Sequence, residues 1–102
     1  MTLPQPGKVL VLVTGTFSVR CTAAGPCSRE LSVQVGGVTV PGATAVVAST
    51  ANVLTSQTIS TAGILANAPA GTLSVAIASR SVGDVLQTSN GGDVRLVAIA
   101  LG

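Results

Sequence analysis

The sequence closes on the stretch Asp93-Val94-Arg95-Leu96-Val97-Ala98-Ile99-Ala100-Leu101-Gly102. Every residue of 96–101 is apolar, so a β-strand at this place would present apolar side chains on both of its faces. One face would cover the core of the domain, and the other would need cover from outside it. We predict that the even-numbered residues of this strand face one apolar environment and that the odd-numbered residues face the other.

One other stretch shares this character: Val9-Leu10-Val11-Leu12-Val13. Alternating β-branched residues are typical of strands, and residues 8–20 as a whole are predicted to form one long strand. Gly15 is expected to mark a bulge or a bend in it. We expect this strand and the terminal strand to pair at the centre of a β-sandwich.

The rest of the sequence alternates short strand patterns with turn signals. Residues 31–35 alternate apolar and polar side chains, and Gly36-Gly37 then indicates a two-residue hairpin turn. The return strand is expected to end at Pro41-Gly42. Weaker strands are expected at 43–49 and 53–61, and a short one at 63–66. Residues 72–80 show the clearest alternation, and 89–93 indicate another turn. Seven to nine short strands without a helical period predict an all-β, antiparallel β-sandwich of about eight strands.

The length of 102 residues predicts a single domain that buries roughly 60–65% of its unfolded surface. Two prolines in residues 1–7 predict an extended N-terminal arm with little strand pairing of its own, followed by the sandwich domain at 8–102. The prolines also argue against a cleaved secretory signal, so we expect the chain to be mature as it begins. The arm is either a frayed terminus or a strap for a neighbouring molecule. As a strap, its contact residues would be Thr2, Leu3, Pro4, Gln5 and Pro6.

Composition argues against several classes of partner. Five basic and three acidic residues leave a net charge of +2, and the basic residues do not cluster. With one aromatic residue in the chain, a nucleic-acid partner is not expected. No apolar run approaches the roughly 18–20 residues of a membrane span, so no membrane partner is expected either. Only 8% of the residues are charged, which is low for a soluble monomer and favours burial in an oligomer.

The sequence contains no histidine, and its only carboxylates are Glu30, Asp84 and Asp93. Because general acid–base and nucleophilic catalysis need such groups close together, we expect no enzyme and no cofactor. The two aspartates could bind a cation, but the interpretation as solvated turn residues is preferred. The pairs Gly36-Gly37 and Gly91-Gly92 precede strands rather than a helix, which argues against a phosphate loop.

Cys21 and Cys27 flank a five-residue loop. A disulfide between them is the preferred interpretation, and two free buried thiols are the alternative. A zinc site is disfavoured because it needs four ligands, and the chain has two cysteines and no histidine.

The doubly apolar strands also supply candidates for an oligomer interface. Arg95 shares a face with the odd-numbered apolar residues of the last strand, where it either reaches water or pairs with an acid of a neighbouring subunit. The candidate interface residues are Val9, Val11, Val13, Arg95, Val97, Ile99 and Leu101.

Four segments together carry a resemblance to a known family. They are the apolar first strand at 8–19, the Gly36-Gly37 hairpin that leads to Val40-Pro41-Gly42, the stretch at 70–77 and the final strand at 95–102. This order resembles the TNF/C1q-like jelly roll, particularly its small versions in bacteriophage virion proteins. The resemblance implies a sandwich of at most ten strands whose first and last strands pair on an inner sheet. That sheet would form the three-fold interface of a homotrimer.

The resemblance further implies a structural virion protein. The expected role is a trimeric capsid decoration (cement) protein on the surface of a bacteriophage head, with the major capsid protein as its partner. One alternative is the receptor-binding head of a phage tail fibre, with weak glycan binding. Another is an extracellular, secreted β-sandwich that acts as a binding module.

Overall fold

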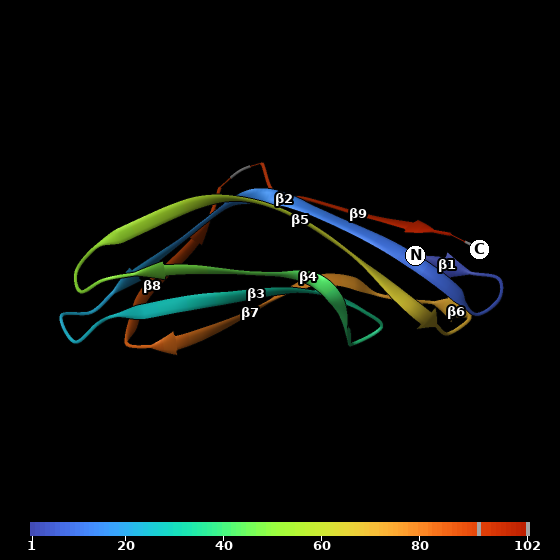
Figure 1. Ribbon diagram of the computed structural model, residues 1–102, viewed down its shortest axis with the longest axis horizontal. Coiled ribbons are helices and arrows are strands. Elements are labelled where there is room, and N and C mark those ends of the chain that lie inside the picture. The colour runs from blue at the N-terminus through green and yellow to red at the C-terminus, as the bar shows by residue number, and fades with distance from the viewer. Residues whose placement is uncertain (92, 102) are drawn as a thin grey trace.

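The computed structural model describes residues 1–91 and 93–101, and it is an all-β protein. Its strands pair antiparallel in two main sheets that lie face to face and in one two-stranded ladder, so the predicted antiparallel β-sandwich is confirmed (Figure 1). Within the described ranges there is no helix, and therefore none that could cross a membrane. The domain is elongated, with extents of 50 × 22 × 18 Å. Gly92 and Gly102, which the sequence places in a turn and at the end of the last strand, lie outside the described residues.

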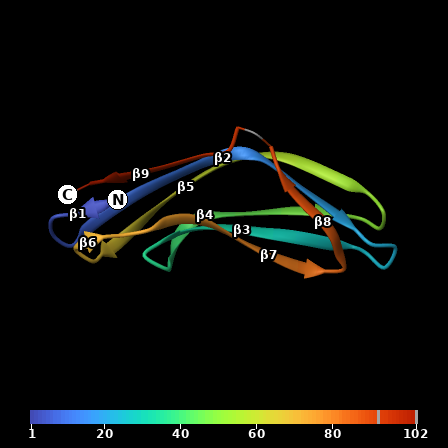
Figure 2. The ribbon, with the colours of Figure 1, turned by 180° about the vertical axis from the view of Figure 1, so that it is seen from behind.

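The first sheet is built around one long strand, β2 (Gly7–Cys21). It pairs on one side with β5 (Leu54–Ala68) and on the other with β8 (Val85–Asn90) and β9 (Arg95–Ala100). Figure 2 shows β8 and β9 following the length of β2 one after the other. The register of β9 runs from Val9 opposite Ala100 to Thr14 opposite Arg95. The predicted pairing of the two doubly apolar stretches is therefore confirmed.

The second sheet places β3 (Cys27–Val35) between β4 (Val38–Ser49) and β7 (Val75–Gly83). Gly36 and Gly37 join β3 to β4 with φ values of +58° and +82°. A two-residue hairpin turn of this kind favours glycine because both residues take positive φ. The predicted hairpin is confirmed.

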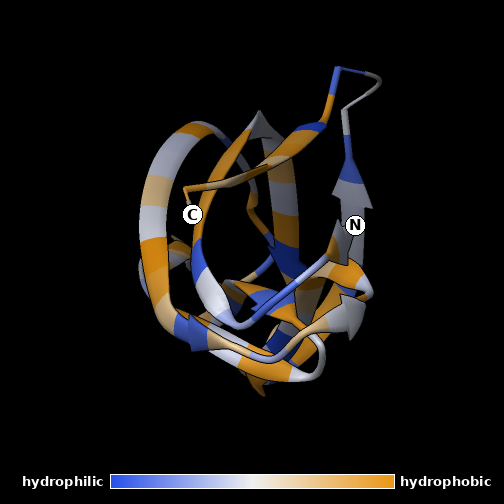
Figure 3. Ribbon diagram, turned by 90° about the vertical axis from the view of Figure 1, so that its right-hand side faces the viewer, coloured by the Kyte–Doolittle hydropathy of each residue, from blue (hydrophilic) through white to orange (hydrophobic). Residues whose placement is uncertain are grey.

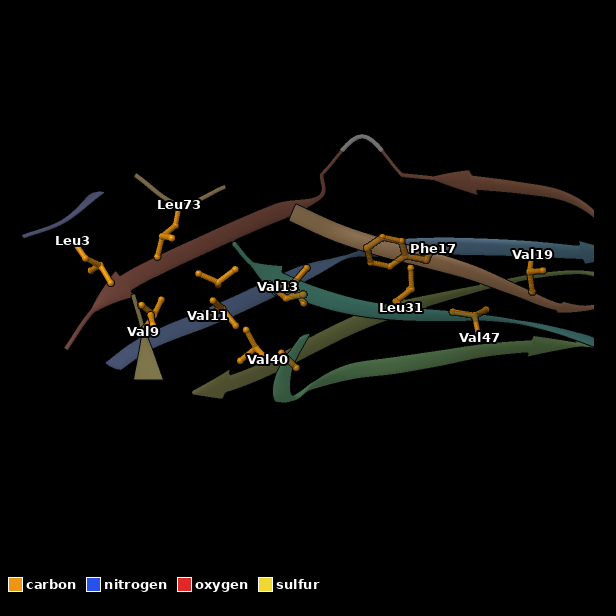
Figure 4. Close-up of a cluster of buried hydrophobic side chains, with 14 of the residues drawn as sticks. Leu3, Val9, Val11, Val13, Phe17, Val19, Leu31, Val40, Val47 and Leu73 are labelled. Atoms are coloured by element: carbon orange, nitrogen blue, oxygen red, sulfur yellow. The ribbon is translucent and has the colours of Figure 1, made fainter. Parts of the chain in front are cut away.

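The hydrophobic core lies between the two main sheets (Figure 4). Its inward side chains alternate along the strands with outward ones, as the pleat of a β-strand requires. Valine dominates because β-branched side chains pack well on a pleated surface. The largest fully buried side chains are Phe17, Val9, Val11, Val19, Val33, Val35, Val40, Val47 and Cys21.

Two strand boundaries differ from the sequence prediction. Pro41-Gly42 does not end a strand, because Gly42 takes a φ of +83° and the pairing with β3 shifts register nearby while β4 continues to Ser49. This is the behaviour of a β-bulge, which bends a strand without ending it. The two strands expected at 53–61 and 63–66 are instead one strand, β5, which spans Leu54–Ala68.

Of the bulge or bend predicted at Gly15, the bulge is absent. Gly15 lies opposite Ile59 in an uninterrupted register. Glycine at this position leaves space for the side chain of Val94, just before β9 begins. A Cβ on residue 15 would lie 2.9 Å from Cγ2 of Val94.

The N-terminal segment does not form the free arm predicted from its prolines. Thr2–Leu3 (β1) pairs with Gly71–Thr72 (β6) in a small ladder at one end of the sandwich. The N-terminal ammonium group of Met1 donates to the carbonyl of Leu73 at 3.2 Å, and the amide of Leu73 donates to the carbonyl of Met1 at 2.7 Å. Leu3 is buried because it closes that end of the core. Thr2 is exposed within this ladder, and residues 4–6 form an exposed stretch after it.

Candidate interaction surface

Apolar side chains lie side by side on the outside of the first sheet. The strand registers place Leu10 between Ile64 and Ile99, and Leu12 between Ala62 and Val97. Paired residues point to the same side of a sheet, so these two rows cross three neighbouring strands. Together with Leu101, which follows β9 directly, they define the apolar outer face: Leu10, Leu12, Ala62, Ile64, Val97, Ile99 and Leu101.

This apolar outer face is open to solvent. Ile99 is 44% exposed, Val97 46%, and Ile64 and Leu101 48% each. Figure 3 shows β9, the strand that leads to the C-terminal label, as mostly apolar on the outside of the molecule. Single exposed apolar residues are ordinary on protein surfaces. A contiguous group across three strands instead indicates a surface that another molecule covers.

The apolar outer face ends where β2 and β5 become polar. Thr14 lies opposite Ser60 next in the register. Two cross-strand hydroxyl pairs follow, with 3.2 Å between Oγ1 of Thr16 and Oγ1 of Thr58, and 2.6 Å between Oγ of Ser18 and Oγ of Ser56. At this border lies an open, shallow concavity. It is lined by Thr14, Gly15, Thr16, Thr58, Asp93 and Arg95.

The outside of the second sheet differs because its central strand, β3, presents charged and polar side chains there. Glu30 lies between Val46 and Arg80 in the register, and the Glu30 carboxylate and the Arg80 guanidinium are 3.6 Å apart. Both charged side chains are well exposed, so this ion pair adds little stability. Polar residues such as Ser32 and Gln34 continue along the same face of β3. The candidate interaction surface therefore belongs to the first sheet alone.

The odd-numbered candidates of the last strand, Val97, Ile99 and Leu101, lie outward with Arg95 on this surface. The interface candidates of the first strand do not lie on this surface. Val9 and Val11 are 0% exposed and Val13 is 5% exposed in the core of the monomer, so their assignment to an oligomer interface is wrong. The outward residues of that stretch are Leu10 and Leu12, because alternation gives the two sets opposite faces.

Among the candidates for the capsid-contact arm, Leu3 is excluded because it is buried in the core. Thr2 is paired with β6 in the small ladder. Residues 4–6 form the exposed loop between β1 and β2. This loop lies beside the end of β9, since Pro4, Gln5 and Ala100 line one small concavity.

Cys21 and Cys27 form a disulfide with a Cα–Cα distance of 5.6 Å. The bond joins the end of β2 to the start of β3 and so links the two sheets at one end of the sandwich. Both residues are buried.

Replacing both cysteines by alanine should lower the free energy of unfolding by about 2 kcal/mol, because a short closed loop restricts the unfolded chain only modestly. Urea unfolding of the oxidised protein, the reduced protein and the double variant measures this, and the last two should agree. Equal stability of the oxidised and reduced proteins would contradict the expectation.

Arg29 is a buried charged residue that the sequence analysis missed. It is 6% exposed and lies between the sheets. Its Nε donates to Oγ of Ser79 at 2.8 Å and its Nη1 to the carbonyl of Ser89 at 3.1 Å. Its Cζ lies 5.4 Å from the centroid of the Phe17 ring, a cation–π contact. Burial lowers the pKa of the Arg29 guanidinium. The odd-numbered pattern of β3, continued back from Leu31, would have placed it inward.

Arg29→Met should leave the free energy of unfolding within about 1 kcal/mol of the wild type, whereas Arg29→Ala should lower it by about 2 kcal/mol or more. Methionine keeps the packing of the long stem and needs no hydrogen bonds, while alanine leaves a cavity. Urea unfolding compares the two. Equal losses in both variants would show that the hydrogen bonds of the guanidinium, rather than the stem, stabilise the fold.

The chemistry of the surface follows from these groups. Across the described ranges, no three His, Cys, Asp or Glu side chains gather as a metal site would require. Asp84 lies at the turn between β7 and β8, where its backbone carbonyl accepts a hydrogen bond from the amide of Thr22 at 2.9 Å. The apolar outer face offers hydrophobic contact, and its border offers hydroxyl groups and one charge of each sign.

Comparisons of the chain with protein families, with curated proteins and with solved structures find no match. The function must therefore be argued from the surface itself.

Proposed function

We propose that the protein is a structural virion protein, a homotrimeric capsid decoration protein that stabilises a bacteriophage head from its outer surface. In this proposal the sandwich is a small TNF/C1q-like jelly roll, and the apolar outer face is the trimer interface. The observation that carries the proposal is the contrast between the two sheets. The outer face of β3 in the second sheet is polar and charged, whereas the outer face of the first sheet is apolar across three strands.

A closed ring is the assembly that this surface favours. Hydrophobic burial yields roughly 25 cal/mol per Å², and the exposed side chains of the apolar outer face are large enough to contribute several kcal/mol per interface by that measure. Most soluble oligomers are closed and symmetric, since an open arrangement leaves its last patch exposed. Three copies around one axis would also match the local three-fold positions of a capsid lattice.

The exposed loop at residues 4–6 is proposed to contact the major capsid protein. Two prolines restrict this loop, so little conformational entropy is lost when it binds. Its ends are fixed by the β1–β6 ladder and by the start of β2. Three such loops on one trimer would give a strong total attachment from three weak contacts.

Light scattering of the purified protein and binding to undecorated capsids test the proposal. Wild type should scatter as a trimer and should bind. Pro4→Ser with Gln5→Ala should keep the trimer and reduce capsid binding. Deleting residues 1–7 is the wrong test, because Met1 and Leu3 contribute to the fold. Pro69→Ser, at another exposed proline, is the matched control. A monomer in solution, or unchanged binding by the loop variant, would contradict the proposal.

The disulfide fits the alternative of an extracellular binding module as well as it fits a virion protein, since disulfides persist in oxidising environments, which include virion and cell surfaces. The threonine-lined concavity at the border would then provide the weak glycan binding of a tail-fibre head. A glycan array with the purified protein separates this role from capsid decoration.

A further inference from the structure

We propose that Asp93 of one copy pairs with Arg95 of the next copy, and that these ion pairs fix the register of the oligomer. This inference rests on the proposed trimer and names the residues that align it. It starts from two exposed, oppositely charged side chains at one border of the apolar outer face.

The two charges lie close together without forming a pair in the monomer. They line the same concavity, yet the ion pair within 4.0 Å among the described residues is that of Arg80 and Glu30. Val94 lies between them in the sequence and packs against the core, in the space that Gly15 leaves. Arg95 is held opposite Thr14 by the register of β9. The backbone therefore presents the carboxylate and the guanidinium as two separate groups beside the concavity.

The position of these charges constrains how a second copy can cover the surface. None of the seven residues of the apolar outer face is charged. A sister subunit that covered this face would remove water from its border, where a lone charge against apolar side chains is costly. At such a dehydrated border, the charges of Asp93 and Arg95 would each need a neighbouring charge of the opposite sign. A second copy carries both.

Ring symmetry makes this pairing self-consistent. In a ring, each subunit uses one patch toward the neighbour before it and another toward the neighbour after it. Asp93 and Arg95 lie at one border of the face. With this border turned toward the ring axis, each subunit would offer its carboxylate to one neighbour and its guanidinium to the other, so that every charge in the closed ring is paired. A packing of the same apolar residues in a shifted register would separate the opposite charges and leave them unpaired at a dehydrated border, which is unfavourable. The apolar residues would thus supply affinity and the charges specificity.

Charge exchange tests the inference. Asp93→Arg alone and Arg95→Asp alone should each weaken the trimer, raising its dissociation constant on the order of tenfold to a hundredfold. The double variant Asp93→Arg/Arg95→Asp should return it close to the wild-type value. Sedimentation equilibrium at low salt measures the constants, and the single-variant effects should shrink in high salt because exposed charges are screened. Circular dichroism checks that each variant is folded.

Arg80→Asp is the matched control, since it reverses an exposed arginine on the outside of the other sheet and should not change assembly. Two single variants that assemble like wild type would overturn the inference and leave the proposed trimer standing. Single variants that weaken the trimer without rescue by the double variant would overturn the pairing as well. A monomeric wild type would overturn the proposed function itself, and this inference with it.

Discussion

Ile99→Asp should convert the proposed trimer into a folded monomer. Ile99 lies in the middle of the apolar outer face, opposite Leu10 of β2, and is 44% exposed in the monomer. In the monomer the new carboxylate would stay hydrated, so the free energy of unfolding should fall by about 1 kcal/mol or less. In the oligomer the same carboxylate would lose its water among apolar side chains, at a cost of several kcal/mol per interface.

Light scattering gives the assembly state of the Ile99→Asp variant, and urea unfolding gives its stability. Val46→Asp is the matched control, because Val46 is an apolar strand residue that is 57% exposed on the outside of the second sheet. The control should assemble as wild type does. A trimer that carries aspartate at position 99 would show that the apolar outer face is not the interface.

The pairing of the first and last strands could be predicted because the signal was local. Each stretch was apolar at consecutive positions, and a strand with two apolar faces belongs inside a sheet that is covered on both sides. The sequence did not settle which set of side chains faces the core. The expected bulge at Gly15 would have broken the alternation between Val13 and Phe17. With the register uninterrupted, Phe17 and the valines share the core face.

Other features were missed because they depend on partners far away in the sequence. The prolines of the N-terminal segment excluded a helix correctly, but nothing local indicates that Thr2 will lie opposite Thr72. Ile64 belongs to the candidate surface only because the register of β5 brings it beside Leu10. Arg29 was overlooked for a different reason. The predicted strand began at Leu31, so the alternation that turns Arg29 inward was not extended back to it.

Gly63→Ala should destabilise the fold by about 3 kcal/mol or more, the largest effect expected of a single methyl group in this chain. The cause is the close approach of β4 to β5 at the side of the sandwich. A Cβ on Gly63 would lie 2.3 Å from the carbonyl oxygen of Pro41 and 2.8 Å from the amide nitrogen of Ala43. Both atoms belong to the backbone, so neither can move aside as a flexible side chain would. The hydrogen bond from Oγ1 of Thr61 to the carbonyl of Gly42, at 3.0 Å, further ties the two strands together.

Gly37→Ala is the control, because its Cβ would meet nothing within 4 Å and only its φ of +82° opposes the substitution. That variant should lose about 1 kcal/mol. Thermal and urea unfolding give the loss of stability of each variant. The loss for Gly63→Ala reports the steric conflict, and the loss for Gly37→Ala reports the backbone strain. Equal losses would mean that β4 and β5 separate easily at this corner. A much larger loss for Gly63→Ala would show that contact between the sheets, beyond the burial of valines, determines how the sandwich closes.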